Sequence, residues 1–535
     1  MTRKPIRFAT AGAASALALA FSALTASADE TAWQFDGSIA LGLWHRNGVT
    51  EGYGQSSGTF TLDNQNGLQS YLNFAIGAAP DAIAGGLPES VVDYTFGIRK
   101  TGLEWDWHAA LGTNALTFGG LLFDELPRRG LLVETSRAGN TITASAFVTR
   151  ASDALDSENL SGLSERDDRI TGAAITLRPA TENELSFTLA GYEGRGAPTP
   201  GDIVGAGSGY ALDVQGNAAE GRLGYAASFA EVDWDADAEL AGLPLSAQAV
   251  AGFVDMAVSN DRNETYLSVE YQRVETDFVS LAQSELDPGL ESLQLRADFL
   301  AGSMSLATYA EITKTNIAGP DTEPTDRLID VTLDGAVDFD GVGFWNSRQL
   351  TFGFGLDRID RLVTPFLAPP PQDATTLNVY LGYEWRASDA RASLSYDVLI
   401  DDDRSALDAD SKTQTLSLWA ERDLNEFLTV GGSIAVSSVT DDLGKWVRSE
   451  AEGFARIGNG ETPHAFDIAF GVTSTNEPLS TDGIFAEIAY DFAITDRTEL
   501  ALKAAYLSGP YAEEFESTEE RVVGIELRRT LGGQP

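Results

Sequence analysis

The sequence has no cysteine, only three histidines among 535 residues, and few basic residues for its many acids. The lack of cysteine argues against a disulfide-stapled extracellular domain and fits a bacterial envelope. With 36 Lys and Arg against 80 Asp and Glu, the formal net charge is −44. Nucleic acid binds basic surfaces, so we expect no nucleic-acid partner.

Long apolar segments are also missing after the first 28 residues. A membrane helix needs about 20 consecutive apolar residues, and no later run approaches that length, which excludes a helical membrane protein. The N-terminus itself has a basic start, an apolar stretch from Ala11 to Leu24, and the small residues Ala26-Ser27-Ala28. This pattern predicts a secretory signal peptide over residues 1–28, cleaved between Ala28 and Asp29.

What the chain has instead is alternation of apolar and polar residues, repeated from about Tyr94 to the C-terminus. Near the C-terminus Leu377, Val379, Leu381, Tyr383 and Trp385 alternate with Thr376, Asn378, Tyr380, Gly382 and Glu384. A period of two predicts strands with one apolar and one polar face. Because strands of this kind repeat without any helical period between them, they favour a barrel that is apolar outside and polar inside.

Turns recur at an even spacing in the same region. Those around Ser388, Leu424, Asn459 and Thr495 follow one another at 36, 35 and 36 residues. Each interval holds two stretches of about ten residues, the length of a tilted membrane-crossing strand. Between the turns lie longer segments rich in Asp, Pro and Gly, such as Ala151 to Asp168, Gly194 to Gly209 and Thr276 to Gly289. We therefore predict an all-β fold, a single large transmembrane antiparallel β-barrel of about 24 strands (range about 22–26), with short periplasmic turns and long acidic extracellular loops.

The domain organisation follows from this pattern. We predict a signal peptide at 1–28, N-terminal barrel strands with a loop or plug segment at 29–90, and the main barrel at 91–535. Trp33 to His45 alternates clearly, whereas Gly48 to Leu68 is irregular. Ala79 to Pro88 reads as a loop or a small plug element.

The whole mature sequence resembles Gram-negative outer-membrane β-barrels of the porin and exporter type. The resemblance lies in the signal peptide, the acidic composition, the turn phrase from Tyr490 to Leu500, and a closing strand with Val523, Ile525, Leu527 and Leu531 outward. It implies export through the secretory pathway to the outer membrane, insertion by the barrel-assembly machinery, and contact with outer-membrane lipid and lipopolysaccharide. The chain ends in Gly-Gly-Gln-Pro rather than in the aromatic residue common there, which bears on recognition by that machinery and not on the fold.

Catalytic chemistry has little support. His108, beside Glu104 and Asp106, forms the best acid–base cluster, and a hydrogen-bonded wall residue is the favoured reading; His45 and His464 lie near strand ends. No Gly-x-Ser-x-Gly elbow, His-Glu-x-x-His motif or calcium loop is present. We expect no catalytic, cofactor-binding or metal site and no enzymatic activity.

Acidic residues gather at the expected loop tips. They are Asp233, Asp235, Asp237 and Glu239; Asp401, Asp402, Asp403, Asp408 and Asp410; and Glu513, Glu514, Glu516, Glu519 and Glu520. Solvation of surface loops is the favoured reading. Loop-bound divalent cations, bridging to lipopolysaccharide phosphates, are the alternative left open.

The polar register assigns charged residues of both signs to the lumen, with acids in excess. They are Glu104, Asp106, His108, Glu220, Arg222, Glu270, Arg296, Asp298, Glu384, Arg448, Glu450, Glu452, Arg456, Glu487 and Asp491, followed by Glu526 and Arg528 of the closing strand. Mutual neutralisation by cross-strand ion pairs is one reading. A selectivity surface is the other, and its acidic excess predicts a preference for cations or neutral polar solutes.

Three functions remain open. The first is a channel for small polar solutes or ions, in which long loops constrict a lumen wider than that of porins with 16 to 18 strands. We expect the loops after Ala151, Gly194 and Thr276 to fill it. The second is an export barrel for a surface polysaccharide or another polymer, working with periplasmic partners. The third is a structural surface protein without transport.

Overall fold

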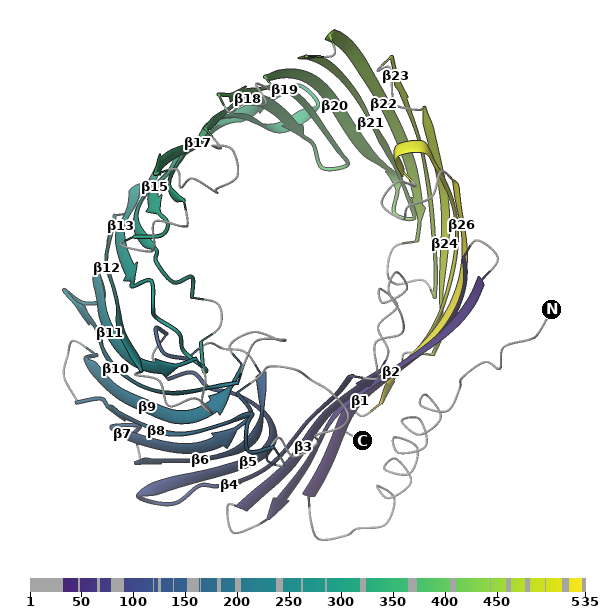
Figure 1. Ribbon diagram of the computed structural model, residues 1–535. Coiled ribbons are helices and arrows are strands. Elements are labelled where there is room, and N and C mark those ends of the chain that lie inside the picture. The colour runs from purple at the N-terminus through teal and green to yellow at the C-terminus, as the bar shows by residue number, and fades with distance from the viewer. Residues whose placement is uncertain are drawn as a thin grey trace.

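The chain forms a closed barrel of 26 antiparallel strands in the computed structural model (Figure 1). The structure describes residues 32–46, 49–64, 68–77, 91–118, 120–123, 127–137, 139–151, 163, 165–179, 184–197, 204–236, 244–260, 263–283, 286–317, 324–363, 373–404, 410–442, 444–458, 463–476, 482–495, 497–511 and 519–531. The predicted signal peptide and its cleavage site at Ala28 and Asp29 lie outside these residues, as does the expected plug element at Ala79 to Pro88.

The first half of the wall contains β1 Ala32–Arg46, β2 Val49–Asn64, β3 Leu68–Gly77, β4 Val91–Lys100, β5 Trp105–Ala115, β6 Pro127–Arg137, β7 Ile142–Thr149, β8 Arg169–Leu177, β9 Ser186–Gly196, β10 Gly205–Ala218, β11 Leu223–Asp235, β12 Leu245–Ser259 and β13 Asn263–Val274. The second half contains β14 Glu291–Ala301, β15 Met304–Lys314, β16 Thr325–Val342, β17 Trp345–Val363, β18 Ala374–Arg386, β19 Ala390–Asp403, β20 Ser411–Asn425, β21 Leu428–Asp441, β22 Gly444–Ile457, β23 His464–Thr475, β24 Gly483–Thr495, β25 Thr498–Ser508 and β26 Glu519–Leu531. The 3-10 turn η2 Gly509–Tyr511 precedes β26.

Each strand pairs with the next one along the chain, and β1 closes the ring by pairing with β26, so that the purple and yellow ends lie side by side in Figure 1. Closure leaves no strand edge with unpaired backbone groups, the condition for crossing a bilayer with strands. Among the described residues, no helix is long and apolar enough to cross a membrane.

The outer face of the wall carries exposed large apolar side chains. Leu381 on β18 is 53% exposed, Ile434 on β21 is 56% and Phe470 on β23 is 58%. Their pairing partners across the strands continue the same face. Leaving this much apolar surface in water would be unfavourable, so the outer face fits lipid contact, as predicted from the alternation.

The longest connections lie at one end of the barrel, and most of the short turns lie at the other. The turn between β14 and β15 uses Gly302 and the turn between β16 and β17 uses Gly343, with φ of 60° and 65°, values that glycine adopts readily. The longest connections, between β7 and β8 and between β13 and β14, lie at the other end. The start of β1 and the end of β26 both lie at the short-turn end.

The predicted fold class is confirmed, with a strand number at the upper limit of the expected range. One strand was hidden in the irregular interval Gly48 to Leu68, which forms β2 and pairs with β1 and β3. Its many Gly, Ser and Thr residues weaken the apolar face, so the period of two is faint there. Half of the expected long segment Gly194 to Gly209 is also strand, since β9 ends at Gly196 and β10 begins at Gly205.

Two long connections form an apolar core against the inner face of the wall. Leu121, Leu122 and Phe123, between β5 and β6, and Phe278 and Leu281, between β13 and β14, are each less than 5% exposed. They pack with inner-face residues of β6 to β12 such as Phe147, Tyr192 and Val232. In Figure 1 the teal connection after β13 lies inside the ring.

Hydrogen bonds join the two connections to each other and to the wall. The Ser280 hydroxyl donates to the Leu122 carbonyl at 2.9 Å, and the Leu281 amide donates to the Tyr192 hydroxyl at 2.9 Å. Gln283 donates to the Gly120 carbonyl at 2.8 Å. The loop after Thr276 therefore folds inward, as expected, and it does so together with the connection between β5 and β6, which the sequence did not indicate. We call these two segments the inserted loops.

Candidate functional site: the inner wall

The strand register places carboxylates next to one another on the inner face of β13 to β20. Direct partners follow the order Glu270, Gln294, Glu311, Asp330, Asp357, Thr376, Asp401 and Ser411, one from each successive strand. We call Glu270, Glu311, Asp330, Asp357 and Asp401 the acidic row. Direct partners in an antiparallel sheet are about 5 Å apart at their Cα atoms, so Glu311, Asp330 and Asp357 form a closely spaced run of negative charge.

Hydroxyl and amide groups surround the carboxylate of Glu311. The Tyr309 hydroxyl donates to Oε2 at 2.5 Å, while Ser292, Thr313 and Gln294 donate to Oε1 at 2.8, 2.9 and 3.3 Å. Donation to a carboxylate stabilises its charge without cancelling it.

Asp401, at the other end of the row, also accepts hydrogen bonds from hydroxyl groups. Thr376 donates to one oxygen at 2.8 Å and Ser411 to the other at 2.9 Å. Within the part of the chain that the structure describes, no Lys or Arg forms an ion pair with any carboxylate of the row. The row therefore keeps its negative field, which attracts cations in a lumen.

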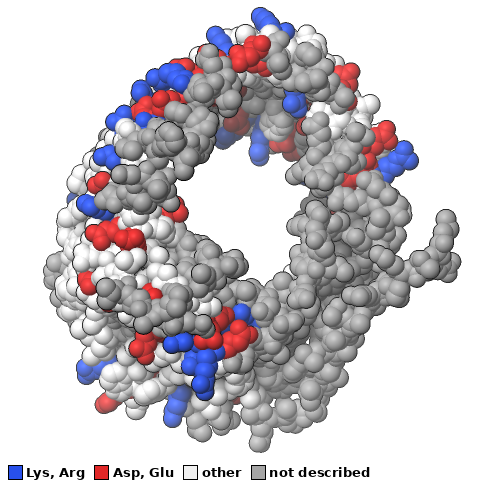
Figure 2. Space-filling view, viewed as in Figure 1, with Lys and Arg blue, Asp and Glu red and all other residues white. Residues whose placement is uncertain are grey.

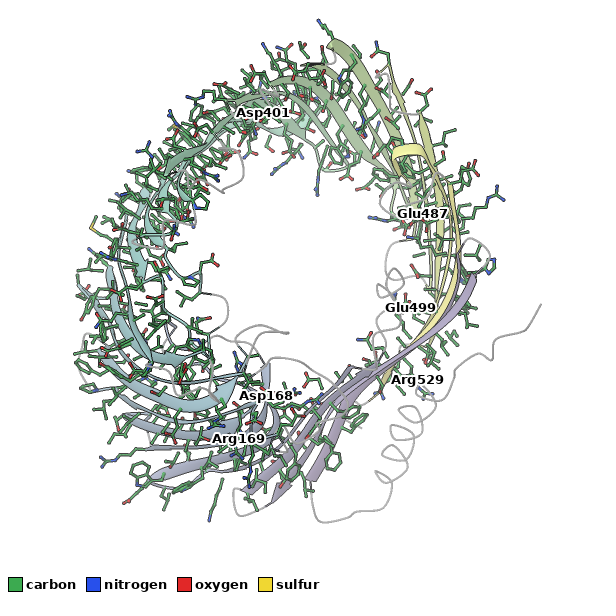
Figure 3. All side chains as sticks on the ribbon, viewed as in Figure 1. Asp168, Arg169, Asp401, Glu487, Glu499 and Arg529 are labelled. Carbon is green, nitrogen blue, oxygen red and sulfur yellow. The ribbon has the colours of Figure 1, made fainter. Side chains whose placement is uncertain are left out.

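Most of the lumen residues expected from the sequence lie on inner-face positions of strands. These are Asp106, His108, Glu270, Arg296, Asp298, Glu384, Arg448, Glu450, Glu452, Arg456, Glu487, Asp491, Glu526 and Arg528. Figure 3 shows Glu487 and Asp401 on different arcs of the ring. Their function in selectivity stays a prediction.

Three expected lumen residues lie in turns instead. Glu104 lies in the connection between β4 and β5, and Glu220 and Arg222 lie in the turn between β10 and β11. Ala219, Glu220 and Gly221 have φ of 51°, 61° and 83°, which ends the strand before the charges reach the wall. The prediction from alternation therefore made these strands too long.

Several basic residues on the inner wall are paired with acids. Arg296 contacts Asp298 at 2.8 Å, Arg448 contacts Glu450 at 2.6 Å, and Arg456 contacts Asp467 at 2.9 Å. The first two pairs join residues two apart on one strand, and the third crosses between strands. These basic residues are therefore neutralised, whereas the carboxylates of the acidic row have no basic partner among the described residues.

His108 does not form the expected cluster with Glu104. Its Nε2 lies 2.6 Å from the Tyr71 hydroxyl, the two rings stack at 5.9 Å, and Glu134 is its direct partner on β6. This is a hydrogen-bonded wall residue. Among the described residues, no group of three or more His, Asp or Glu side chains is arranged to hold a metal ion.

Sequence reasoning missed most of the acidic row. Asp326, Asp330, Asp334 and Asp338 recur every four residues along β16 and so share one face, a signal that the period of two could have revealed. Asp401 was expected at a loop tip and instead lies within β19, because that strand extends to Asp403.

The space-filling view shows a wide opening through the centre of the ring (Figure 2). The inserted loops cover the inner face of β6 to β12, whereas the acidic row lies on β13 to β19. The two features therefore occupy separate arcs of the wall.

The chain's sequence matches no protein-family profile and no curated protein. Among solved structures, it is similar to the P pilus usher PapC translocation pore, with 9% identity, 94% of this chain and 100% of that chain covered, and a TM-score of 0.38. It is also similar to the copper transporter OprC, with 11% identity, 93% and 81% covered, and a TM-score of 0.39. Pseudomonas aeruginosa OccK2 in complex with glucuronate matches with 13% identity, 61% and 92% covered, and a TM-score of 0.36. Similarity this low carries no inference about function, which has to come from the chain's own residues.

Proposed function

We propose that the protein is an outer-membrane channel of a Gram-negative bacterium that passes cations and neutral polar solutes. The observation that supports this most is the acidic row, because five carboxylates lie on one arc of the inner wall without a basic partner among the described residues. The exposed apolar outer face and the closed strand ladder support a location in a bilayer.

The charge of the row determines how selectivity depends on salt. A carboxylate attracts a monovalent cation at 4 Å by about 1 kcal/mol in water. Its field extends about 10 Å at 0.1 M salt and about 30 Å at 0.01 M. In the wide lumen of a 26-stranded barrel, cations that pass far from the wall are screened from the charge of the acidic row at high salt. The preference for cations should therefore increase as salt is lowered.

Export of a polymer is the second candidate function, and the wide central opening in Figure 2 favours it. A conduit for a polymer requires a wide lumen, and fixed charge on the lumen wall is less important for it. If the purified barrel conducts ions without any preference between K⁺ and Cl⁻ at low salt, this second function becomes the better account.

The test uses planar bilayers with a KCl gradient and the double variant Asp330→Asn and Asp357→Asn. Asn keeps the shape of Asp while removing both charges of a directly paired step of the row. We expect the K⁺ preference to fall by roughly two- to five-fold at low salt.

Asp402→Asn is the matched control for this experiment. Asp402 follows Asp401 directly but lies on the outer face of β19, beside Arg404 at 3.5 Å. Equal effects of the control and of the double variant would show that the row has no special function in selectivity.

A further inference from the structure

The inner wall also contains a pocket, separate from the acidic row and nearer to the short-turn end. Its volume is about 780 Å³, and its lining includes Glu264, Tyr266, Asp298, Asp334 and Tyr380 from four different strands. Between them lie small residues, Ser305, Ala307 and Ala336. Small residues between larger polar ones produce a recess rather than a flat wall.

Tyr380 lies over Gly353 in the lining of this pocket. A side chain on Gly353, the direct partner of Tyr380 on β17, would meet the tyrosine ring, with its Cβ 2.0 Å from Cε1 and 2.5 Å from Cζ. Only glycine leaves room for the ring here, so the ring covers the backbone of β17. The ring is therefore next to the inner side of β17 and stays partly exposed to the lumen.

Carboxylates lie on both sides of the Tyr380 ring. Direct partners run in the order Asp334, Gly353, Tyr380 and Asp397 across β16 to β19. The Tyr380 hydroxyl donates to Asp334 Oδ1 at 2.7 Å, which fixes the ring beside that carboxylate. An aromatic face with carboxylates at its edges attracts a cation through both charge and the ring quadrupole.

The basic residue of the pocket does not cancel this charge. Arg296 pairs with Asp298 at 2.8 Å, and its guanidinium lies 5.9 Å from the centroid of the Tyr266 ring. Glu264, Asp334 and Asp397 form no ion pair among the described residues. The pocket is therefore negative overall, with an aromatic floor.

We propose that this pocket is a binding subsite for small organic cations, in which a methylated or protonated amine lies over the Tyr380 ring between Asp334 and Asp397. This proposal rests on the proposed function, because it assigns a class of solute to the channel. Binding in the pocket can be measured without any transport. A hydrated inorganic cation would use the carboxylates equally well, but it would gain little from the ring, because it keeps its water shell.

The experiment titrates the purified, folded barrel with tetramethylammonium chloride by calorimetry. The variant Tyr380→Leu removes the ring, and we expect binding to weaken by about two- to five-fold, the range for a cation over an exposed aromatic ring. Tyr380→Phe keeps the ring and should bind within about two-fold of the unmodified protein. Gly353→Ala should weaken binding as Tyr380→Leu does, because the added methyl group displaces the ring.

Tyr396→Leu is the matched control, since Tyr396 lies on the outer face of the neighbouring strand β19 and is 43% exposed. It should leave binding unchanged. Resistance of each variant to unfolding on unheated gels shows that the barrel is intact. Equal binding by Tyr380→Leu and the unmodified protein, tighter binding of a neutral sugar than of tetramethylammonium, or absence of tetramethylammonium binding would each overturn the proposal.

Failure of this subsite can be distinguished from failure of the channel. Bi-ionic measurements with K⁺ on one side and tetramethylammonium on the other report the subsite, whereas a KCl gradient reports the cation preference of the whole lumen. Tyr380→Leu should change the first measurement and leave the second unchanged, because it removes no charge.

Discussion

Freeing the inserted loops from the wall should increase the conductance of the barrel. Phe278 is 2% exposed and Leu281 is 3% exposed, and both pack in the core that joins the loops to β6 to β12. Truncating a fully buried Phe to Ala costs about 3–5 kcal/mol, and a buried Leu about 2–5 kcal/mol. Because the two residues share one core, the free-energy losses of the two substitutions do not add. Their combined loss cannot exceed the free energy with which the loop docks on the wall.

The strand ladder does not depend on that core. All 26 strand pairings are backbone hydrogen-bonded around the closed ring, so the double variant Phe278→Ala and Leu281→Ala should release the loop while the barrel stays folded. The milder variant Tyr192→Phe removes the acceptor of the Leu281 amide. A buried amide without an acceptor costs about 1–3 kcal/mol, so this variant should release the loop partially.

Single-channel recording in planar bilayers measures the conductance, and limited proteolysis at the connection between β13 and β14 measures release. We expect both to increase in the order unmodified protein, Tyr192→Phe, double variant. Leu295→Ala is the control, because Leu295 is 45% exposed on the outer face of β14 and contacts no inserted loop. Conductance that does not change although proteolysis shows the loop released would refute the reasoning that these loops narrow the lumen.

The remaining predictions concern the two faces of the wall. Leu381→Arg on the outer face of β18 should destabilise the barrel in lipid vesicles by about 2–4 kcal/mol, measured by urea unfolding, because an arginine would face the hydrocarbon; an unchanged midpoint would reverse the face assignment. Arg448→Glu on the inner face breaks the 2.6 Å pair with Glu450 and adds negative charge. It should increase the K⁺ preference in a KCl gradient, and a decrease would contradict the inner register of β22.

The two faces of the barrel could be predicted from sequence because the side-chain period of a strand is two. The segment from Leu377 to Trp385 alternates strictly between apolar and polar residues, so the sequence pattern alone predicts that its apolar side chains point outward. The same rule placed Arg448, Glu450 and Glu487 on the inner face. The rule gave a weaker signal in β2, where Gly, Ser and Thr take the place of many of the apolar residues on the outer face.

The ends of strands and the paths of loops could not be predicted in this way. Glu220 and Asp401 were both misplaced, since alternation does not define where a strand stops. The segment Phe278 to Ala282 is largely apolar within an acidic loop, which indicates that it is buried. Its sequence does not predict that it packs against Phe147 and Tyr192. Contacts between residues far apart in sequence depend on the closed barrel, which local patterns do not encode.

The zero-current potential of the unmodified barrel in a planar bilayer between 0.1 M and 0.01 M KCl tests the central claim most directly. A lumen that carries the unpaired carboxylates of the acidic row, Glu270, Glu311, Asp330, Asp357 and Asp401, should pass K⁺ in preference to Cl⁻. The dilute side should then become positive, and the potential should shrink when both concentrations are raised tenfold, since the Debye length falls from roughly 30 to 10 Å and below. A negative dilute side, or no conductance at any concentration, would contradict the account.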